Sequence, residues 1–242
     1  MIEPPIKSIL AIALLATTTL SGCDSLPGRP NPADVPLRPS AITDFSQLYG
    51  ENCAGCHGAD GKSGAAIAMN NPIYLAIIDD ASMRRAIAGG VPGTAMPPFA
   101  ESAGGSLTDR QIDLLIAGIR KNWAGPPRST AGYPPYSTSI AGDPNRGAQV
   151  YAAKCQSCHG PDGKGDRSVG SIVDPSYLSL VSDQYLRTIV IAGRPGLGHP
   201  DWKNTQANRI SVVVIQPLTP AQISDVVAWM ASKRPSSRAL SN

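Results

Sequence analysis

The chain has few aromatic residues, a weak net charge and no long hydrophobic run beyond its N-terminus. Aromatic residues make up 5% of the 242 positions, so the bulky side chains that usually fill a core are scarce. The formal net charge is +3 without a basic run, which argues against nucleic acid as a partner. One hydrophobic stretch cannot form a polytopic membrane protein. Because 42% of the residues are hydrophobic, we expect a folded chain whose core could be completed by an apolar cofactor.

The first 22 residues are typical of a secretory signal peptide. Lys7 supplies the positive end, and residues 9–15 form an apolar segment too short for a comfortable membrane span. The segment Leu20–Cys23 resembles a bacterial lipobox, in which the cysteine carries a diacylglycerol after cleavage. We therefore expect a lipid on Cys23 that anchors the chain to a membrane on the periplasmic side of a bacterial cell envelope. An ordinary signal peptide or an uncleaved anchor are the alternatives.

Two proline-rich stretches divide the remainder of the chain. Residues 23–43 contain five prolines and predict an extended tether, and residues 124–144 predict a linker. The stretches leave two candidate domains, 44–123 and 145–235, followed by a tail at 236–242.

The two candidate domains repeat the same landmarks in the same order. Residues 48–62 align with residues 150–164, at an offset of 102. The segment Gly90–Pro97 aligns with Gly193–Pro200 at an offset of 103, and residues 107–112 align with 218–223 at an offset of 111. Three matches in one order indicate a duplicated domain.

Each repeat closes with a predicted amphipathic helix. Thr108 and Thr219 have the position of N-caps, with Gln111 and Gln222 as capping-box partners. Apolar residues follow at helical spacing in both segments, which predicts one buried face for each helix. These stripes are Ile112, Leu115, Ile116 and Ile119 in the first repeat, and Ile223, Val226, Val227 and Met230 in the second.

Four of the five cysteines lie in two Cys-x-x-Cys-His motifs, at residues 53–57 and 155–159. This spacing is that of a c-type haem attachment site. Two thiols on one helical turn reach the two vinyl groups of a porphyrin, and the adjacent imidazole then faces the iron. A zinc site, a thioredoxin-like redox pair and two local disulfides are the alternatives, and local disulfides leave both histidines unexplained. The motifs predict attachment through Cys53, Cys56, Cys155 and Cys158, with iron ligation by His57 and His159.

The whole pattern resembles a dihaem cytochrome c built from two class I cytochrome c domains. The resemblance implies an all-α fold of two tandem haem domains joined by the proline-rich linker, and two covalently bound haem c groups. It implies electron transfer without a small-molecule substrate. It also implies that a proline carbonyl, from Pro72 or Pro175, accepts the N–H of each iron-bound imidazole.

The sixth iron ligands are expected to differ between the domains. The resemblance implies a Met-Pro step, which Met96 supplies in the first domain, with Met69 and Met83 as competitors. The matching position in the second domain is His199, and Met230 lies on the apolar helix stripe. A five-coordinate iron or another ligand is the alternative to His199. Because a thioether raises haem potential relative to a second imidazole, we expect electrons to run from the second site to the first.

The function expected from these residues is membrane-anchored electron transfer, as a carrier or as a subunit of a respiratory or photosynthetic complex. The partners are then redox proteins, and the chain itself is not an enzyme. A dihaem cytochrome c peroxidase-like enzyme is the alternative, and a haem-based gas sensor is a third. The β-branched run at residues 210–215 predicts a short strand.

Overall fold

The computed structural model describes residues 31, 35–203 and 217–235, and the chain divides into two units, Met1–Arg38 and Pro39–Asn242. The predicted signal peptide, Cys23, the predicted strand at 210–215 and the tail at 236–242 lie outside the described residues. In the part that is described, no helix has the length and apolarity needed to cross a membrane.

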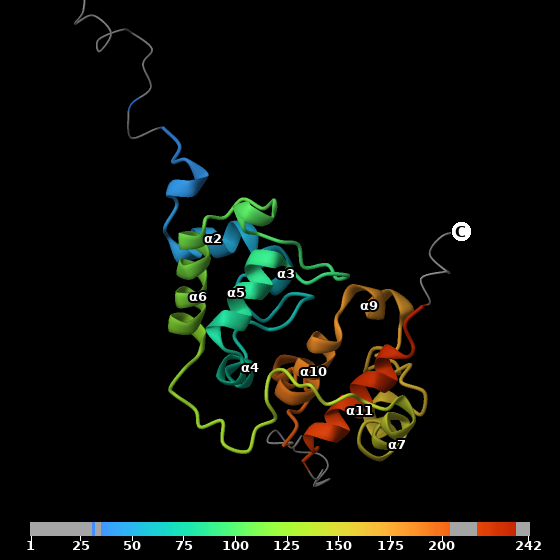
Figure 1. The fold of residues 1–242 in the computed structure, drawn as a ribbon. Coiled ribbons are helices and arrows are strands. Elements are labelled where there is room, and N and C mark those ends of the chain that lie inside the picture. The colour runs from blue at the N-terminus through green and yellow to red at the C-terminus, as the bar shows by residue number, and fades with distance from the viewer. Residues whose placement is uncertain (1–30, 32–34, 204–216, 236–242) are drawn as a thin grey trace, which may run out of the picture. The chain divides into compact units, whose positions relative to one another are not determined.

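The regular elements of the described residues are all helical (Figure 1), as expected for an all-α fold. The β-structure recorded for these residues is two isolated bridges, Ala100 with Leu107 and Arg194 with His199. The first repeat contains η3 (Pro39–Ala41), α2 (Phe45–Asn52), α3 (Ala54–His57), α4 (Pro72–Ile77), α5 (Asp80–Gly89), η4 (Glu101–Ala103) and α6 (Asp109–Trp123). The second contains α7 (Pro144–Lys154), α8 (Gln156–His159), α9 (Pro175–Leu180), α10 (Asp183–Ala192), η5 (Pro195–Leu197) and α11 (Pro220–Ala231).

The two closing helices begin where the sequence predicts. In α6 the Thr108 side chain accepts from the Gln111 backbone, and the Gln111 side chain accepts from the Thr108 backbone. Thr219 and Gln222 form the same capping box on α11, and Pro220 occupies the first turn, where no N–H is required. The predicted stripes are buried in both helices, with Ile112 and Ile223 at 0% exposure.

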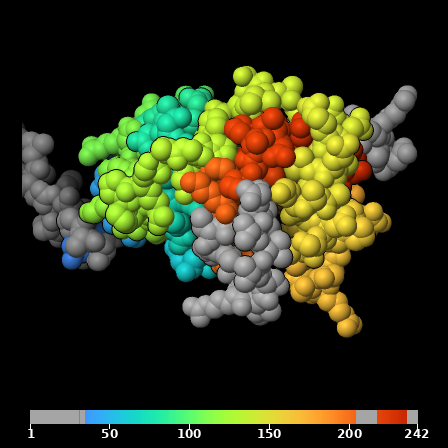
Figure 2. Space-filling view, turned by 90° about the horizontal axis from the view of Figure 1, so that it is seen from below, coloured from blue at the N-terminus to red at the C-terminus, as the bar shows by residue number. Residues whose placement is uncertain are grey.

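In each repeat the first helix crosses the last helix at a glycine. A Cβ on Gly118 of α6 would lie 2.0 Å from the Phe45 ring of α2. In the second repeat the glycine is on the opposite helix, because a Cβ on Gly147 of α7 would lie 2.0 Å from the Asp225 carbonyl oxygen and 2.8 Å from Trp229 of α11. Figure 2 shows α11 packed directly against α7. Close approach of the two helices therefore needs one small residue at the crossing. This residue is on the last helix in the first repeat and on the first helix in the second repeat.

The segment between the repeats is held by hydrogen bonds to α10. Arg187 is 3% exposed, and its guanidinium donates to the carbonyls of Pro135 and Tyr136. The Gln184 amide also donates to the Tyr136 carbonyl, at 2.8 Å. These bonds fix the middle of the proline-rich segment to the second repeat.

Candidate haem sites

Each Cys-x-x-Cys-His motif forms a single helical turn directly after the first helix of its repeat. In the first repeat the His57 N–H donates to the Cys53 carbonyl at 2.9 Å, and the His159 N–H donates to Cys155 at 3.0 Å. These hydrogen bonds close the turns α3 and α8. They place both cysteines of each motif within one turn of the following histidine, as attachment to a single porphyrin requires.

The four motif cysteines are free thiols in two environments. Cys56 and Cys158 are exposed, whereas Cys53 and Cys155 are half-buried. Burial, and to a smaller extent the neighbouring motif cysteine, raises the pKa of Cys53 and of Cys155 to about 11. The half-buried thiols are therefore protonated at neutral pH.

A buried tyrosine holds each attachment turn, α3 or α8, by a hydrogen bond. The Tyr49 hydroxyl donates to the Gly58 carbonyl at 3.0 Å, and the Tyr151 hydroxyl donates to the Gly160 carbonyl. Both tyrosines precede the first cysteine of their motif by four residues, so they lie on the same helix face. The acceptors directly follow His57 and His159, and the bonds therefore fix the end of the turn that carries each histidine.

A tryptophan packs on each of these tyrosines, but the two tryptophans come from different helix positions. Trp123 meets Tyr49 edge to face at 4.9 Å, whereas Trp229 stacks on Tyr151 at 4.1 Å. At the offset of 111, Trp229 corresponds to Gly118, the glycine of the first crossing. The large and the small residue have therefore exchanged helices. The last helix carries glycine in the first repeat and tryptophan in the second.

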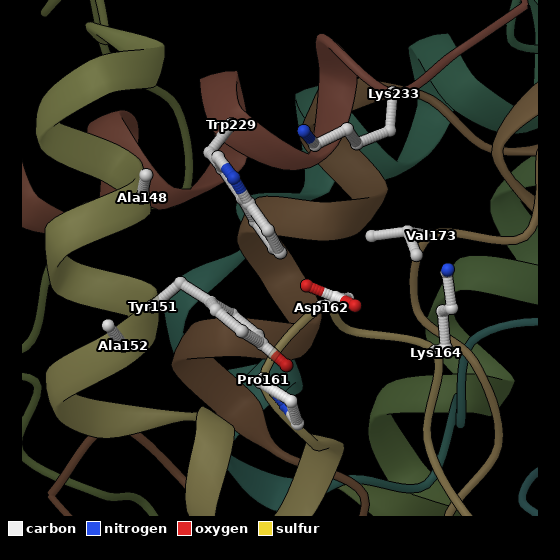
Figure 3. A pocket seen from close by; sticks show the side chains of 9 residues that line it. All are labelled: Ala148, Tyr151, Ala152, Pro161, Asp162, Lys164, Val173, Trp229 and Lys233. Atoms are coloured by element: carbon white, nitrogen blue, oxygen red, sulfur yellow. The ribbon is translucent and has the colours of Figure 1, made fainter.

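A hollow of about 610 Å³ is lined by residues of α7, of α11 and of the loop that follows the second attachment turn (Figure 3). Its floor is the stacked pair Tyr151 and Trp229, and Lys233 lies 5.5 Å from the Trp229 ring. The residues lining this hollow include none of the motif cysteines or histidines. It is therefore separate from the residues predicted to hold haem.

His57 is oriented as an iron ligand requires. Its side chain is 8% exposed, and Nδ1 lies 2.9 Å from the Ile67 carbonyl oxygen. A hydrogen bond from Nδ1 leaves Nε2 free to coordinate a metal. The expectation that Pro72 supplies this carbonyl was wrong, because the carbonyl belongs to Ile67. Pro72 and Pro175 are instead the first residues of α4 and α9, where a fixed φ favours helix initiation.

The structure brings His159 and His199 together although they are 40 residues apart in the sequence. Their ring centroids are 5.9 Å apart, with 51° between the ring planes. Two metal–nitrogen bonds of about 2 Å, with half an imidazole ring on each side, place the centroids about 6 Å apart. The spacing of the two rings therefore fits a shared metal ion.

The protonation state of this pair also suits coordination. The pKa of His199 is lowered to about 4 by burial, by the nearby His159 and by Arg194, so its imidazole is neutral. Burial lowers the pKa of His159 as well. Both Nδ1 atoms are buried and make no hydrogen bond in the described part of the chain. Neutral imidazole is the form that binds metals.

The loop carrying His199 has the same backbone frame as the loop carrying Met96. The Arg194 N–H donates to the His199 carbonyl at 3.1 Å, and the Val91 N–H donates to the Met96 carbonyl at 3.0 Å. Each loop follows a glycine with positive φ, Gly90 or Gly193, whose Cβ would collide with backbone atoms of the loop. The two loops that the sequence alignment paired, with His199 opposite Met96, therefore share the same backbone hydrogen bond and the same glycine conformation.

The three methionines of the first repeat lie in different surroundings. Met69 and Met83 are 7% and 1% exposed and belong to the hydrophobic core. Met96 is half-buried in a loop and lies outside that core cluster. Two of the three thioethers are therefore engaged in packing, and Met96 is the one that the fold leaves available.

Comparison with known families assigns both repeats. A family model described as cytochrome c matches residues 144–233. A second one, described as cytochrome C oxidase, cbb3-type, subunit III, matches residues 40–117. The chain is a dihaem cytochrome c. Two domains of this kind imply two covalently bound haem c groups, and the arrangement of free thiols and histidines described above fits them.

Curated relatives include subunits of respiratory complexes. The chain is 26% identical over 85% of its length to the cbb3-type cytochrome c oxidase subunit FixPc of Rhizobium leguminosarum bv. viciae, and covers 66% of it. It is 32% identical over 55% of its length to the subunit CcoP of Rubrivivax gelatinosus, covering 38% of that protein. It is also 24% identical, over 66% of its length, to a cytochrome bc1 complex cytochrome c subunit of Mycobacterium bovis, covering 56%. The chain thus spans between 38% and 66% of these relatives.

Proposed function

We propose that this dihaem cytochrome transfers electrons between redox proteins, as a carrier or as a subunit of a membrane respiratory complex. The observation that carries the proposal is the pairing of His159 with His199, which gives the second domain two imidazoles across one site. The first domain has one histidine and an available thioether instead. Similarity to oxidase and bc1 subunits supports a respiratory partner.

The residues that would hold the cofactors follow from these positions. Cys53 and Cys56 would attach the first haem, with His57 and Met96 on the iron. In the second domain Cys155 and Cys158 would attach the haem, and His159 and His199 would be the ligands. The bound haems supply one-electron redox chemistry, and the protein sets their ligands, orientation and exposure.

The different sixth ligands would separate the two sites in potential. A thioether stabilises the reduced iron more than a second imidazole does, so the first site would have the higher potential. With both axial positions filled by side chains, neither site would offer a free position to peroxide or to a gas. The ligand sets therefore favour electron transfer over peroxidase or sensor activity.

A lipid on Cys23 would hold the chain at the periplasmic surface of a membrane, where respiratory complexes are present. The support for this anchor is the sequence of the segment Leu20–Cys23 together with the apolar residues before it. A diacylglycerol would give membrane attachment without a spanning helix. Mass spectrometry of the protein from membranes tests it, because lipidation at Cys23 predicts a diacylated N-terminal peptide that is lost in Cys23→Ser.

The function is tested with the purified holo-protein in its reduced form. We expect it to release two electrons per chain to a cbb3-type oxidase in the presence of oxygen, and to bind no carbon monoxide. Peroxide in place of the oxidase is expected to give no sustained turnover. Sustained peroxide reduction, or carbon monoxide binding at the second site, would contradict the proposal and favour the peroxidase or sensor function.

A further inference from the structure

The two haem domains meet along an interdomain seam formed by Gly64, Asn71 and Ala95 of the first domain and by Leu180 and residues 192–194 of the second. Asn71 is 4% exposed, and its amide donates to the carbonyls of Ala192 and Gly193 at 3.0 and 3.2 Å. The Ala95 N–H donates to the Leu180 carbonyl at 3.3 Å. The seam thus includes the residue before Met96 and the start of the loop that carries His199.

Arg194 connects this seam to both candidate sites. Its backbone pairs with His199 in both directions, since the Arg194 N–H donates to His199 and the His199 N–H donates back at 3.2 Å. Its guanidinium donates to the Gly64 carbonyl in the first domain at 3.1 Å. Gly64 lies against the first attachment turn, because a Cβ there would be 2.1 Å from the Cys56 carbonyl oxygen.

The same place in the first domain is occupied by an uncharged residue. Val91 corresponds to Arg194 at the offset of 103 and makes the same backbone hydrogen bond, to Met96. Arg194 therefore adds a permanent positive charge to the ligand loop of the second domain alone. A nearby cation favours the reduced form of an iron site, because reduction removes one positive charge.

We propose that Arg194 is a positioning residue that links the His199 loop to the first attachment turn and raises the potential of the second haem site. The link fixes the separation of the two sites, and the charge reduces the difference between their potentials. This inference rests on the proposed function, because it assigns His199 to the iron of the second site.

The experiment compares the wild-type holo-protein with four variants by redox titration and by the rate of electron transfer between the sites. Arg194→Gln removes both the charge and the guanidinium group, whereas Arg194→Lys keeps the charge but lacks the guanidinium group. Arg167→Gln removes one positive charge from an exposed position of the same domain and serves as the control. Visible and electron paramagnetic resonance spectra report whether His199 remains bound in each variant.

We expect Arg194→Gln to lower the potential of the second site, with unchanged ligand spectra. Transfer between the sites should slow by about tenfold, because the loss of the link outweighs the larger driving force. Arg194→Lys is expected to keep the potential but to slow transfer. Val91→Arg should raise the potential of the first site. An equal shift in Arg167→Gln, or no change in Arg194→Gln, would overturn the inference. A wild-type protein with a single potential would instead overturn the proposed function.

Discussion

Asp225 is a single carboxylate on which the helix crossing of the second domain depends. It is 4% exposed and accepts two hydrogen bonds from Arg146 at 2.9 Å and one from the Asp143 backbone at 2.7 Å. These hydrogen bonds, from Arg146 above all, lower the pKa of Asp225 below its ordinary 3.8. Because the folded pKa is lowered, the stabilisation is complete above the ordinary pKa and is lost as the pH falls through the folded pKa.

We expect Asp225→Asn to lower the free energy of unfolding at neutral pH by about 2 kcal/mol, since hydrogen bonds to a charged group are lost. The loss of stability on acidification below about pH 4 should also become smaller. Urea unfolding across the pH range measures both effects. The control is Asp162→Asn, which changes an exposed carboxylate of the same domain. An Asp225→Asn protein with wild-type acid sensitivity would show that another group causes it.

Replacement of Met96 tests the ligand of the first site against its competitors. Met96→His should lower the potential of the higher-potential site, because an imidazole replaces a thioether. Met83→Leu should leave that potential unchanged and affect only packing, since Met83 is 1% exposed in the core. Redox titration of both holo-proteins measures the difference. The opposite pattern would assign the iron to Met83.

At the scale of single residues, the sequence predicted the motif residues but not the groups that form hydrogen bonds with them. The spacing of cysteines and histidines is local, and the alignment of repeats placed His199 opposite Met96. The carbonyl that meets His57 belongs to Ile67, and backbone carbonyls carry no sequence signature. Tyr49 and Tyr151 had a signal, their shared position four residues before a cysteine, but their acceptors depend on the fold.

At the scale of helices, the glycines at the two crossings should differ in their tolerance of a methyl group. Gly118→Ala places a Cβ against the Phe45 ring, a side chain that can move, whereas Gly147→Ala places it against the Asp225 backbone. We expect a loss of about 1–3 kcal/mol for Gly118→Ala and a larger one for Gly147→Ala. Urea unfolding of each variant measures the losses.

A second substitution separates the two cases. Phe45→Ala should recover part of the stability lost in Gly118→Ala, because the colliding ring is removed. In the second domain, Trp229→Ala should not rescue Gly147→Ala, because the nearest atom is a backbone oxygen. A double-mutant cycle gives the coupling energy in each domain. Equal coupling in the two domains would contradict this description of the crossings.

The helices themselves were the most predictable part of the fold. Capping boxes and apolar periodicity predicted the closing helices and their buried faces. The exchange of large and small residues at the crossing could not be predicted. It depends on which residues meet when two helices that are far apart in the sequence cross. Apolar periodicity identifies the buried face of a helix but not the helix that packs against it.

At the scale of the whole molecule, Asn71 should couple the stability of the two domains. Its amide caps α4 and also donates to the end of α10, so Asn71→Ala removes contacts on both sides of the seam. We expect a loss of about 2 kcal/mol and separate unfolding transitions for the two domains. Calorimetry of the holo-protein measures this. Asn122→Ala, which removes an amide bonded within α6, is the control and should keep the wild-type pattern.

The seam is also the feature that sequence reasoning did not anticipate. The proline-rich stretch at 124–144 predicted a linker, but the contacts that Asn71 and Arg194 make across the domains join residues more than 100 positions apart. Their side chains bond to backbone carbonyls, which are present at every residue. No periodicity or motif can therefore indicate such pairs before the fold is known.

A redox titration of the wild-type holo-protein beside His199→Met tests the mixed ligation of the two haems most directly. Two separate waves are expected in the wild type. In the variant only the lower wave should move upward, because a thioether replaces an imidazole at the second site. A lower wave that does not move in His199→Met, or a single wave in the wild type, would contradict the assignment of His199 as an iron ligand.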